Sequence, residues 1–139
     1  MFPNGLYAMN PILKTLGAYL IYSILLLAAP VKAQITPDTT LRSEASRLTL
    51  NQFINGASAN RVDGGAQRGI NLFHSFSQFN IGDAQSVYFA NPVGVQNILA
   101  RITGSSASNI LGILGVDGAA NLFLINPNGI LFGKNASLD

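Results

Sequence analysis

Residues 97–139 read NILARITGSSASNILGILGVDGAANLFLINPNGILFGKNASLD, and one short pattern returns in them at a fixed interval. Asn97-Ile98-Leu99, Asn109-Ile110-Leu111 and Asn121-Leu122-Phe123 begin twelve residues apart, and a fourth apolar run, Ile130–Gly133, follows the turn-like Asn126–Gly129. Short runs rich in Ile, Leu and Phe and bounded by Gly and Asn are typical of strands. A unit of one strand and one turn cannot bury its own apolar face, so copies must stack. Two units give a coil of about 24 residues, which predicts an all-β solenoid.

Short strand and turn signals also fill the chain before this repeat. Strands or strand ends are predicted at Leu48–Leu50, Phe53–Gly56, Ser86–Pro92 and Val95–Thr103. Asp63-Gly64-Gly65 predicts a tight hairpin turn, since these residues tolerate positive φ. Residues 34–40 are polar and contain Pro37, and we expect them to be a lead-in.

Composition bounds the function. The 139 residues allow one modest domain, and only 10% of them are charged, far below the usual ~25%. Beyond residue 33, six Lys and Arg face six Asp and Glu, so no basic patch favours a nucleic-acid partner. The chain has no cysteine, which excludes disulfides, thiolate metal sites and a cysteine nucleophile.

The N-terminus has the composition of an export signal. Lys14 precedes the apolar run Leu16–Ala29, and the small residues of Val31-Lys32-Ala33 follow. The run is shorter than the ~20 residues needed to span a bilayer comfortably. We therefore expect residues 1–33 to be a signal peptide that directs the chain to the general export machinery. Signal peptidase would then cleave it before Gln34. An uncleaved N-terminal anchor is the alternative.

An aromatic segment precedes the repeat. Phe73, Phe76 and Phe79 recur every three residues, which would place them on one side of a helical or 3₁₀ turn. Together with His74 they are expected to plug the open N-terminal end of the solenoid as a cap. His74 has no Ser, Asp or second ligand at a recognisable spacing, so we interpret it as structural rather than as a base or ligand.

Polar residues of the repeat have simple structural interpretations. Asn126-Pro127-Asn128-Gly129 is explained as a tight bend between two strands, because Pro127 fixes φ and Asn-Gly tolerates left-handed angles. Arg101 lies between Ala100 and Ile102 and should point outward if those two face the core. Residues 34–139 hold twelve asparagines, whose side-chain amides could pair between neighbouring coils.

Three segments together resemble a known family. Gly69–Phe79 (GINLFHSFSQF), Asn97–Gly104 (NILARITG) and Asn121–Gly133 (NLFLINPNGILFG) are similar to the two-partner secretion domain of filamentous haemagglutinin-like exoproteins, above all the cyanobacterial ones. The resemblance covers residues 34–139, and Asn126–Ile130 matches a family motif, Asn-Pro-Asn-Gly-Ile. It implies a right-handed parallel β-helix with an N-terminal cap, which presents the exoprotein to the POTRA domains of an outer-membrane β-barrel transporter.

The resemblance also implies where function would lie. Transporter recognition or a structural turn is expected at Asn126, Pro127, Asn128, Gly129, Ile130, Asn91 and Pro92. The exoprotein would pass through the periplasm and be secreted or held at the cell surface, commonly as an adhesin, haemagglutinin or cytolysin. A host or surface glycan could be bound through further C-terminal regions. No cofactor, metal or catalytic residue is implied.

Two departures from the family stand out. The motif Asn-Pro-Asn-Leu is not intact, since Val93-Gly94 follows Asn91-Pro92. The chain also ends at Asp139, whereas family domains continue for many more coils, so we expect a fragment of a longer exoprotein.

A β-solenoid is also compatible with two other functions. A β-solenoid enzyme acting on polysaccharide needs several charged groups converging on one groove, but Asp63, Asp83 and Asp117 are isolated in the sequence. An adhesive solenoid without a dedicated transporter is the third possibility.

Overall fold

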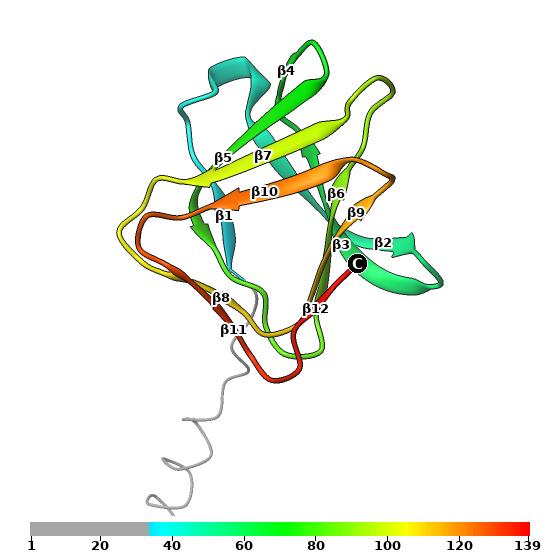
Figure 1. The fold of residues 1–139 in the computed structure, drawn as a ribbon, viewed down its shortest axis with the longest axis vertical. Coiled ribbons are helices and arrows are strands. Elements are labelled where there is room, and N and C mark those ends of the chain that lie inside the picture. The colour runs from blue at the N-terminus through cyan, green and yellow to red at the C-terminus, as the bar shows by residue number, and fades with distance from the viewer. Residues whose placement is uncertain (1–33) are drawn as a thin grey trace, which may run out of the picture. The chain divides into compact units, whose positions relative to one another are not determined.

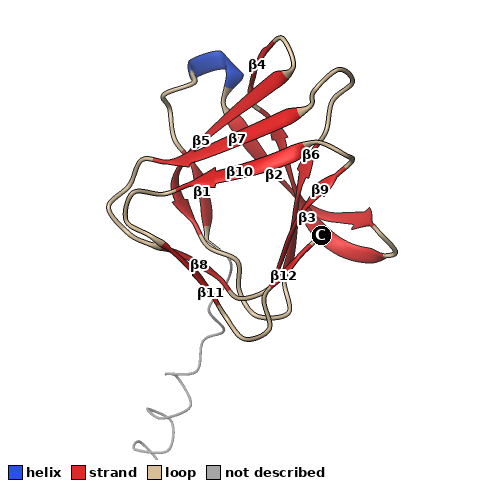
Figure 2. Ribbon diagram, viewed as in Figure 1, coloured by secondary structure: helices blue, strands red, loops and turns tan. Residues whose placement is uncertain are grey.

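The computed structural model describes residues 34–139, so the predicted signal peptide lies outside the described residues. Within that range almost all regular structure is strand, and the 3₁₀ turn η1 (Arg42–Glu44) is the one helical element (Figure 2). The strands are β1 (Ile35–Pro37), β2 (Ser46–Ile54), β3 (Ala57–Gly64), β4 (Ala66–Arg68), β5 (Asn71–Phe79), β6 (Ser86–Ala90), β7 (Asn97–Ile102), β8 (Ser108–Ile110), β9 (Ile113–Asp117), β10 (Asn121–Ile125), β11 (Ile130–Phe132) and β12 (Ser137–Leu138).

The strands form three sheets that surround one core. Parallel strands β5, β7 and β10 lie in sheet A, β8 and β11 in sheet C, and β6, β9 and β12 in sheet B. Figure 1 shows the sheets as three sides of a triangle, and the chain visits A, C and B in turn. Residues 71–139 thus make about three turns of a β-solenoid, as the repeat predicted.

The coil length follows from the register. Asn71, Asn97 and Asn121 stand opposite one another on β5, β7 and β10. The Asn97 amide donates to Asn71 Oδ1 at 3.0 Å across a separation of 26 residues, and the Asn121 amide donates to Asn97 Oδ1 at 3.1 Å across 24. The predicted coil and amide pairing are both confirmed. Asn109 lies half a coil away, on β8 of sheet C.

The apolar positions of the repeat face the core. Ile98 and Ile110 are fully buried, and Leu122 is partly buried against the same cluster. Arg101 is exposed between buried Ala100 and Ile102, as the alternation predicts.

Residues 34–68 cover the edge of the first coil. β1 and β4 pair antiparallel with β5, and β3 pairs parallel with β6 while forming an antiparallel hairpin with β2. Unpaired strand edges attract other strands, so this cap protects the coil. The prediction of a lead-in at residues 34–40 was therefore wrong. Ile35 is buried and pairs with Phe79, and this distant pairing leaves no local pattern.

The hairpin turn lies elsewhere than predicted. Asn55 and Gly56, with φ of 51° and 82°, form the two-residue turn between β2 and β3. Gly64 and Gly65 do have positive φ, at 74° and 88°, but they take the chain from β3 of sheet B to β4 of sheet A. Asp63-Gly64-Gly65 is thus a corner between sheets and not a hairpin.

The aromatic segment is a strand, so the predicted helical or 3₁₀ turn is wrong. Phe73, Phe76 and Phe79 all lie on β5. Where β5 pairs with β1, Thr36 is opposite Gln78 but Pro37 is opposite Phe76, so Ser77 is an extra residue in the ladder. Such a β-bulge re-aims the following side chains, which brings both Phe76 and Phe79 into the core three residues apart.

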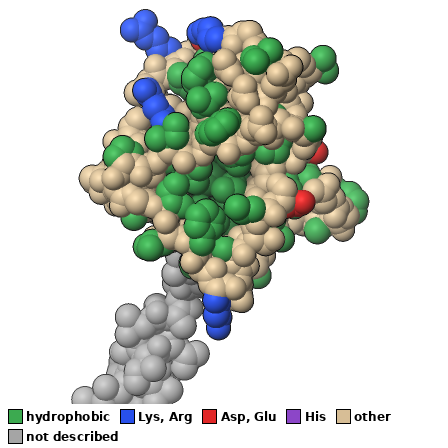
Figure 3. Space-filling view, in the orientation of Figure 1, with side chains coloured by type: hydrophobic (Ala, Val, Ile, Leu, Met, Phe, Trp, Pro, Cys, Tyr) green, Lys and Arg blue, Asp and Glu red, His purple; other side chains and the backbone are tan. Residues whose placement is uncertain are grey.

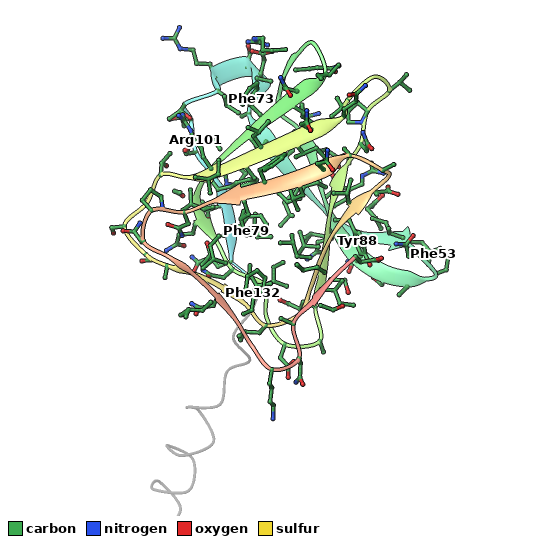
Figure 4. All side chains as sticks on the ribbon, viewed as in Figure 1. Phe53, Phe73, Phe79, Tyr88, Arg101 and Phe132 are labelled. Carbon is green, nitrogen blue, oxygen red and sulfur yellow. The ribbon has the colours of Figure 1, made fainter. Side chains whose placement is uncertain are left out.

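The β2–β3 hairpin forms one edge of sheet B, next to β6. Its Ile54 and Ala59 bury the ring of Tyr88 from β6 in a small second cluster. Phe53, on the same hairpin, is 82% exposed and projects from the body (Figure 4). The end of the hairpin therefore gains little from burial.

Candidate functional site

The motif Asn126–Ile130 forms the corner between β10 and β11. Gly129 N donates to Asn126 O at 3.0 Å, and Asn128 N donates to Asn126 Oδ1 at 2.9 Å, so the predicted tight bend is confirmed. Of the predicted Asn-Gly pair only Gly129 has positive φ, at 101°. Ile130 begins β11 and is partly buried against the core.

Side-chain amides tie this corner to the coil before it. Asn126 Nδ2 donates to Ser106 O and to Ser108 Oγ, both at 3.0 Å. Asn128 Nδ2 donates to Gly104 O at 2.8 Å. Backbone carbonyls of one corner are thus satisfied by asparagines of the next. Each such bond contributes about 0.5–1.5 kcal/mol net.

Asn91 plays the same part at another corner, after β6. Its Oδ1 accepts from Ala119 N at 3.0 Å and Ala120 N at 2.9 Å, in the corner one coil further on. Its Nδ2 donates to Val95 O at 3.0 Å. Val95 N bonds to Pro92 O, which closes a turn in which Val93 is fully exposed. Of the family motif Asn-Pro-Asn-Leu, this chain therefore keeps Asn91-Pro92, and the residues that follow form a protruding turn.

Replacing Asn126 by Ala should show how much this corner contributes to stability. The change removes an acceptor within the turn and two donors to the neighbouring coil, and we expect a loss of about 1–2 kcal/mol in the free energy of unfolding. Asn135→Ala is the matched control, since that exposed amide bonds to the Asp83 carboxylate at the surface. It should stay within about 0.5 kcal/mol of wild type in urea denaturation. Equal losses in the two variants would contradict the structural role of Asn126.

The predicted cap residues divide between two faces of β5. His74, Phe76 and Phe79 are buried, and their rings contact one another and Phe89 at centroid distances of 5.2–6.3 Å. Phe73 is only partly buried and lies on the outer face of sheet A. The prediction that these residues cap the solenoid is therefore wrong: the three buried ones belong to the core of the first coil, and β1 to β4 form the cap.

His74 links the first coil to the cap. Its Nδ1 lies 2.9 Å from Ser46 Oγ on β2, and its buried Nε2 has no hydrogen-bond partner among the described residues. Burial lowers the pKa of His74 from 6.5 to about 4, against an opposing effect of the Asp63 carboxylate. The imidazole is therefore neutral at physiological pH, and its burial agrees with a structural histidine.

The lowered pKa of His74 predicts a pH dependence of stability. In the unfolded chain the ring takes up a proton below pH 6.5, whereas the folded protein resists it until about pH 4. Stability should therefore fall as the pH drops from 6.5 to 4, by about 3 kcal/mol, and stay level above that window. His74 is the single histidine of the sequence, so His74→Gln should remove this slope whatever its effect on stability at pH 7. The same slope in His74→Gln, measured by urea denaturation at each pH, would contradict the assignment.

A polar network that sequence reasoning missed fixes the N-terminal segment on sheet A. Asp38 accepts bonds from Thr40 N, Thr40 Oγ1, Ser75 Oγ and Thr103 Oγ1 at 2.6–2.9 Å. Arg101 donates to Ser75 Oγ and Thr40 Oγ1 at 3.0 Å. Partial burial acts to raise the pKa of Asp38, but the bonds from Thr40, Ser75 and Thr103 outweigh it and lower the pKa from 3.8 to about 2.

The acidic side chains of the described residues are not gathered into a metal site. Across residues 34–139 there is no group of three or more His, Cys, Asp or Glu side chains that could hold a metal. Asp63 pairs with Arg61 at 2.9 Å, and Asp117 lies 3.9 Å from the same arginine. In this range, likewise, there is no helix of the length and apolarity that a membrane crossing requires.

These observations define a class: a capped, three-faced β-solenoid whose corner turns are tied together by asparagine side chains. The profile of one protein family, the TPS secretion domain, matches residues 33–139. The chain belongs to this family of two-partner secretion, a non-catalytic module that TpsB-type transporters recognise for secretion across the outer membrane. Comparison with curated proteins and with solved structures gave no match. Family membership decides against both alternative functions, the polysaccharide-active enzyme and the adhesive solenoid without a dedicated transporter.

Proposed function

We propose that this module is the head of a filamentous haemagglutinin-like exoprotein of the cyanobacterial type, acting as an adhesin or haemagglutinin. Residues 1–33 would direct it through the general export machinery, and signal peptidase would release it into the periplasm. There the POTRA domains of the TpsB-type transporter would bind it. Support comes from the family assignment and from the segments that resemble those exoproteins.

The transporter reads the motifs Asn126–Ile130 and Asn91-Pro92 before the coils form. This proposal is supported by one observation. In the folded module the side chains of Asn91 and Asn126 already form hydrogen bonds to neighbouring corners. A partner that recognises these amides by hydrogen bonds must meet them in an extended chain. Such a chain can also add backbone hydrogen bonds along an open strand edge of the partner.

Folding outside the cell then gives direction to transport. Each coil that forms buries apolar surface, worth about 25 cal/mol per Å², on the coil before it. Ile98 and Ile110, for example, are fully buried between strands that only stacking brings together. Return through the transporter would require that surface to be exposed again.

The test compares binding of isolated POTRA domains to folded and unfolded forms of the module. Wild type supplies the folded form, and Ile98→Asp supplies a form that cannot complete its core. We expect POTRA domains to bind Ile98→Asp at least about ten-fold more tightly, a difference of about 1.4 kcal/mol. Adding Asn126→Ala to Ile98→Asp should weaken binding, and adding Asn135→Ala should not. Equal binding of folded and unfolded protein, or no effect of Asn126, would overturn the proposal.

A further inference from the structure

A groove lies on the outer face of sheet A, beside the cap. Phe73 and Leu99 stand in register on β5 and β7, on the face opposite to the buried residues that flank each of them. Leu41, which precedes η1, Ala66 on β4 and Ile125 at the end of β10 complete its apolar lining. The hollow has a volume of about 440 Å³, within the range of small-molecule sites. Figure 4 labels Phe73 and Arg101 at this part of the molecule, and in Figure 3 apolar side chains lie close to Lys and Arg side chains.

The charged side chains that line the groove are both cationic. Arg68 and Arg101 contribute to it, and no carboxylate of the described residues lines it. Arg68 forms two bonds, of 2.8 and 2.9 Å, to the exposed Glu44 carboxylate, so its charge is largely matched. His74 also lines the groove, but its lowered pKa leaves it neutral.

Arg101 is held in place by neutral groups. Its Nε and Nη2 donate to two hydroxyls, and within residues 34–139 no carboxylate lies within 4.0 Å of it. Asp38 lies behind those hydroxyls and already accepts four bonds from other donors. A guanidinium has five N–H groups in a rigid fork suited to a carboxylate. The groove thus combines an apolar floor with a preorganised cation that retains unused donors.

We propose that this groove binds an aliphatic carboxylate, with the chain on Phe73, Leu99 and Ile125 and the carboxylate on Arg101. An apolar chain gains by leaving water, and the charge-assisted bonds to Arg101 select an anionic head over a cationic or neutral one. The site belongs to the folded, exported module and does not depend on how the transporter recognises the chain.

The test uses protein purified after export, with decanoate as the probe. Decylammonium has the same chain and the opposite charge, and decanol has no charge. By titration calorimetry, below concentrations that lower the melting temperature, decanoate should bind at least about ten-fold more tightly than either. Failure of decanoate to bind, or equal affinity for all three, would overturn the proposal.

Two variants locate the site. Arg101→Gln should weaken decanoate binding about ten-fold, and Arg47→Gln, an exposed arginine on β2, should not. Because Arg101 also holds Thr40 and Ser75, Leu99→Gln provides a second variant that leaves that network in place, and it too should weaken binding. Undiminished binding to Arg101→Gln or to Leu99→Gln, in protein that still melts cooperatively, would place the ligand elsewhere and contradict the proposal.

Discussion

Ile98→Asp is expected to unfold the module. Ile98 has no exposed surface, and its neighbours in register, Leu72 and Leu122, leave no partner for a carboxylate. Burying an unpaired charge in such a place costs more than about 4 kcal/mol, which is most of the stability of a domain of this size. Far-UV circular dichroism and urea denaturation should show a chain without a cooperative transition.

Val93→Asp is the matched control. Val93 is fully exposed in the turn after Pro92, so the same charge should change the free energy of unfolding by about 0.5 kcal/mol or less. Ile110→Asp should behave like Ile98→Asp, and Leu122→Asp should have a smaller effect because Leu122 is only partly buried. A folded, cooperative Ile98→Asp protein would contradict the position of Ile98 in the core.

Ile98→Asp also distinguishes recognition by the transporter from transport across the membrane. If the transporter binds the extended chain, Ile98→Asp should still bind the POTRA domains but should not accumulate outside the cell, because its coils cannot form there. Cells that make the transporter should secrete Val93→Asp normally. Normal secretion of Ile98→Asp would count against folding as the source of direction.

Phe79→Ala is expected to have the second-largest effect. Phe79 is 1% exposed, and its ring lies 5.2 Å from that of Phe76 and 5.8 Å from that of Phe89. Removing a buried phenylalanine leaves a cavity and costs about 3–5 kcal/mol. For a domain of this size each kcal/mol lowers the melting temperature by roughly 4–8 °C, so the loss should be plain in a thermal scan.

Phe53→Ala makes the same substitution where the side chain is 82% exposed, at the end of the β2–β3 hairpin. It should change stability by about 0.5 kcal/mol or less. Comparable losses in Phe53→Ala and Phe79→Ala would contradict the division between the core of the first coil and the projecting hairpin.

The repeating part of this fold was predictable because stacked coils place residues of the same kind at regular intervals along the sequence. Asn97 and Asn121 occupy the same position on successive coils, so the spacing of their apolar runs gave the coil length directly. The outward direction of Arg101 followed from simple alternation on β7. Each of these features depends on neighbours a few residues or one repeat away.

The cap was not predictable in the same way. β1 pairs with residues of β5 some 40 positions later, and Ile35-Thr36-Pro37 is too short to show alternation. The three phenylalanines misled for a different reason. A bulge at Ser77 changes the strand period locally to three, and three is also the spacing of a helical face.

The candidate site was found only in part. Asn126 and Asn91 were identified from the sequence, but the amide bonds that make them part of the stack cross 18–29 residues. The bonds of Asp38 to Ser75 and Thr103 join residues 37 and 65 positions apart, and no local pattern marks them. Family resemblance pointed to the motifs, whereas only the structure shows that their side chains are engaged.

The stacking of successive coils is tested most directly by a disulfide. The chain has no cysteine, so Asn97→Cys/Asn121→Cys introduces one isolated pair. In-register neighbours on parallel strands lie about 4.8 Å apart, within the Cα range of a disulfide. Thiol titration of the oxidised, purified protein should find this pair bonded, and Asn97→Cys/Asn109→Cys, whose members lie on different sheets, should keep its thiols free. Free thiols at 97 and 121 together with a bond between 97 and 109 would contradict the 24-residue coil.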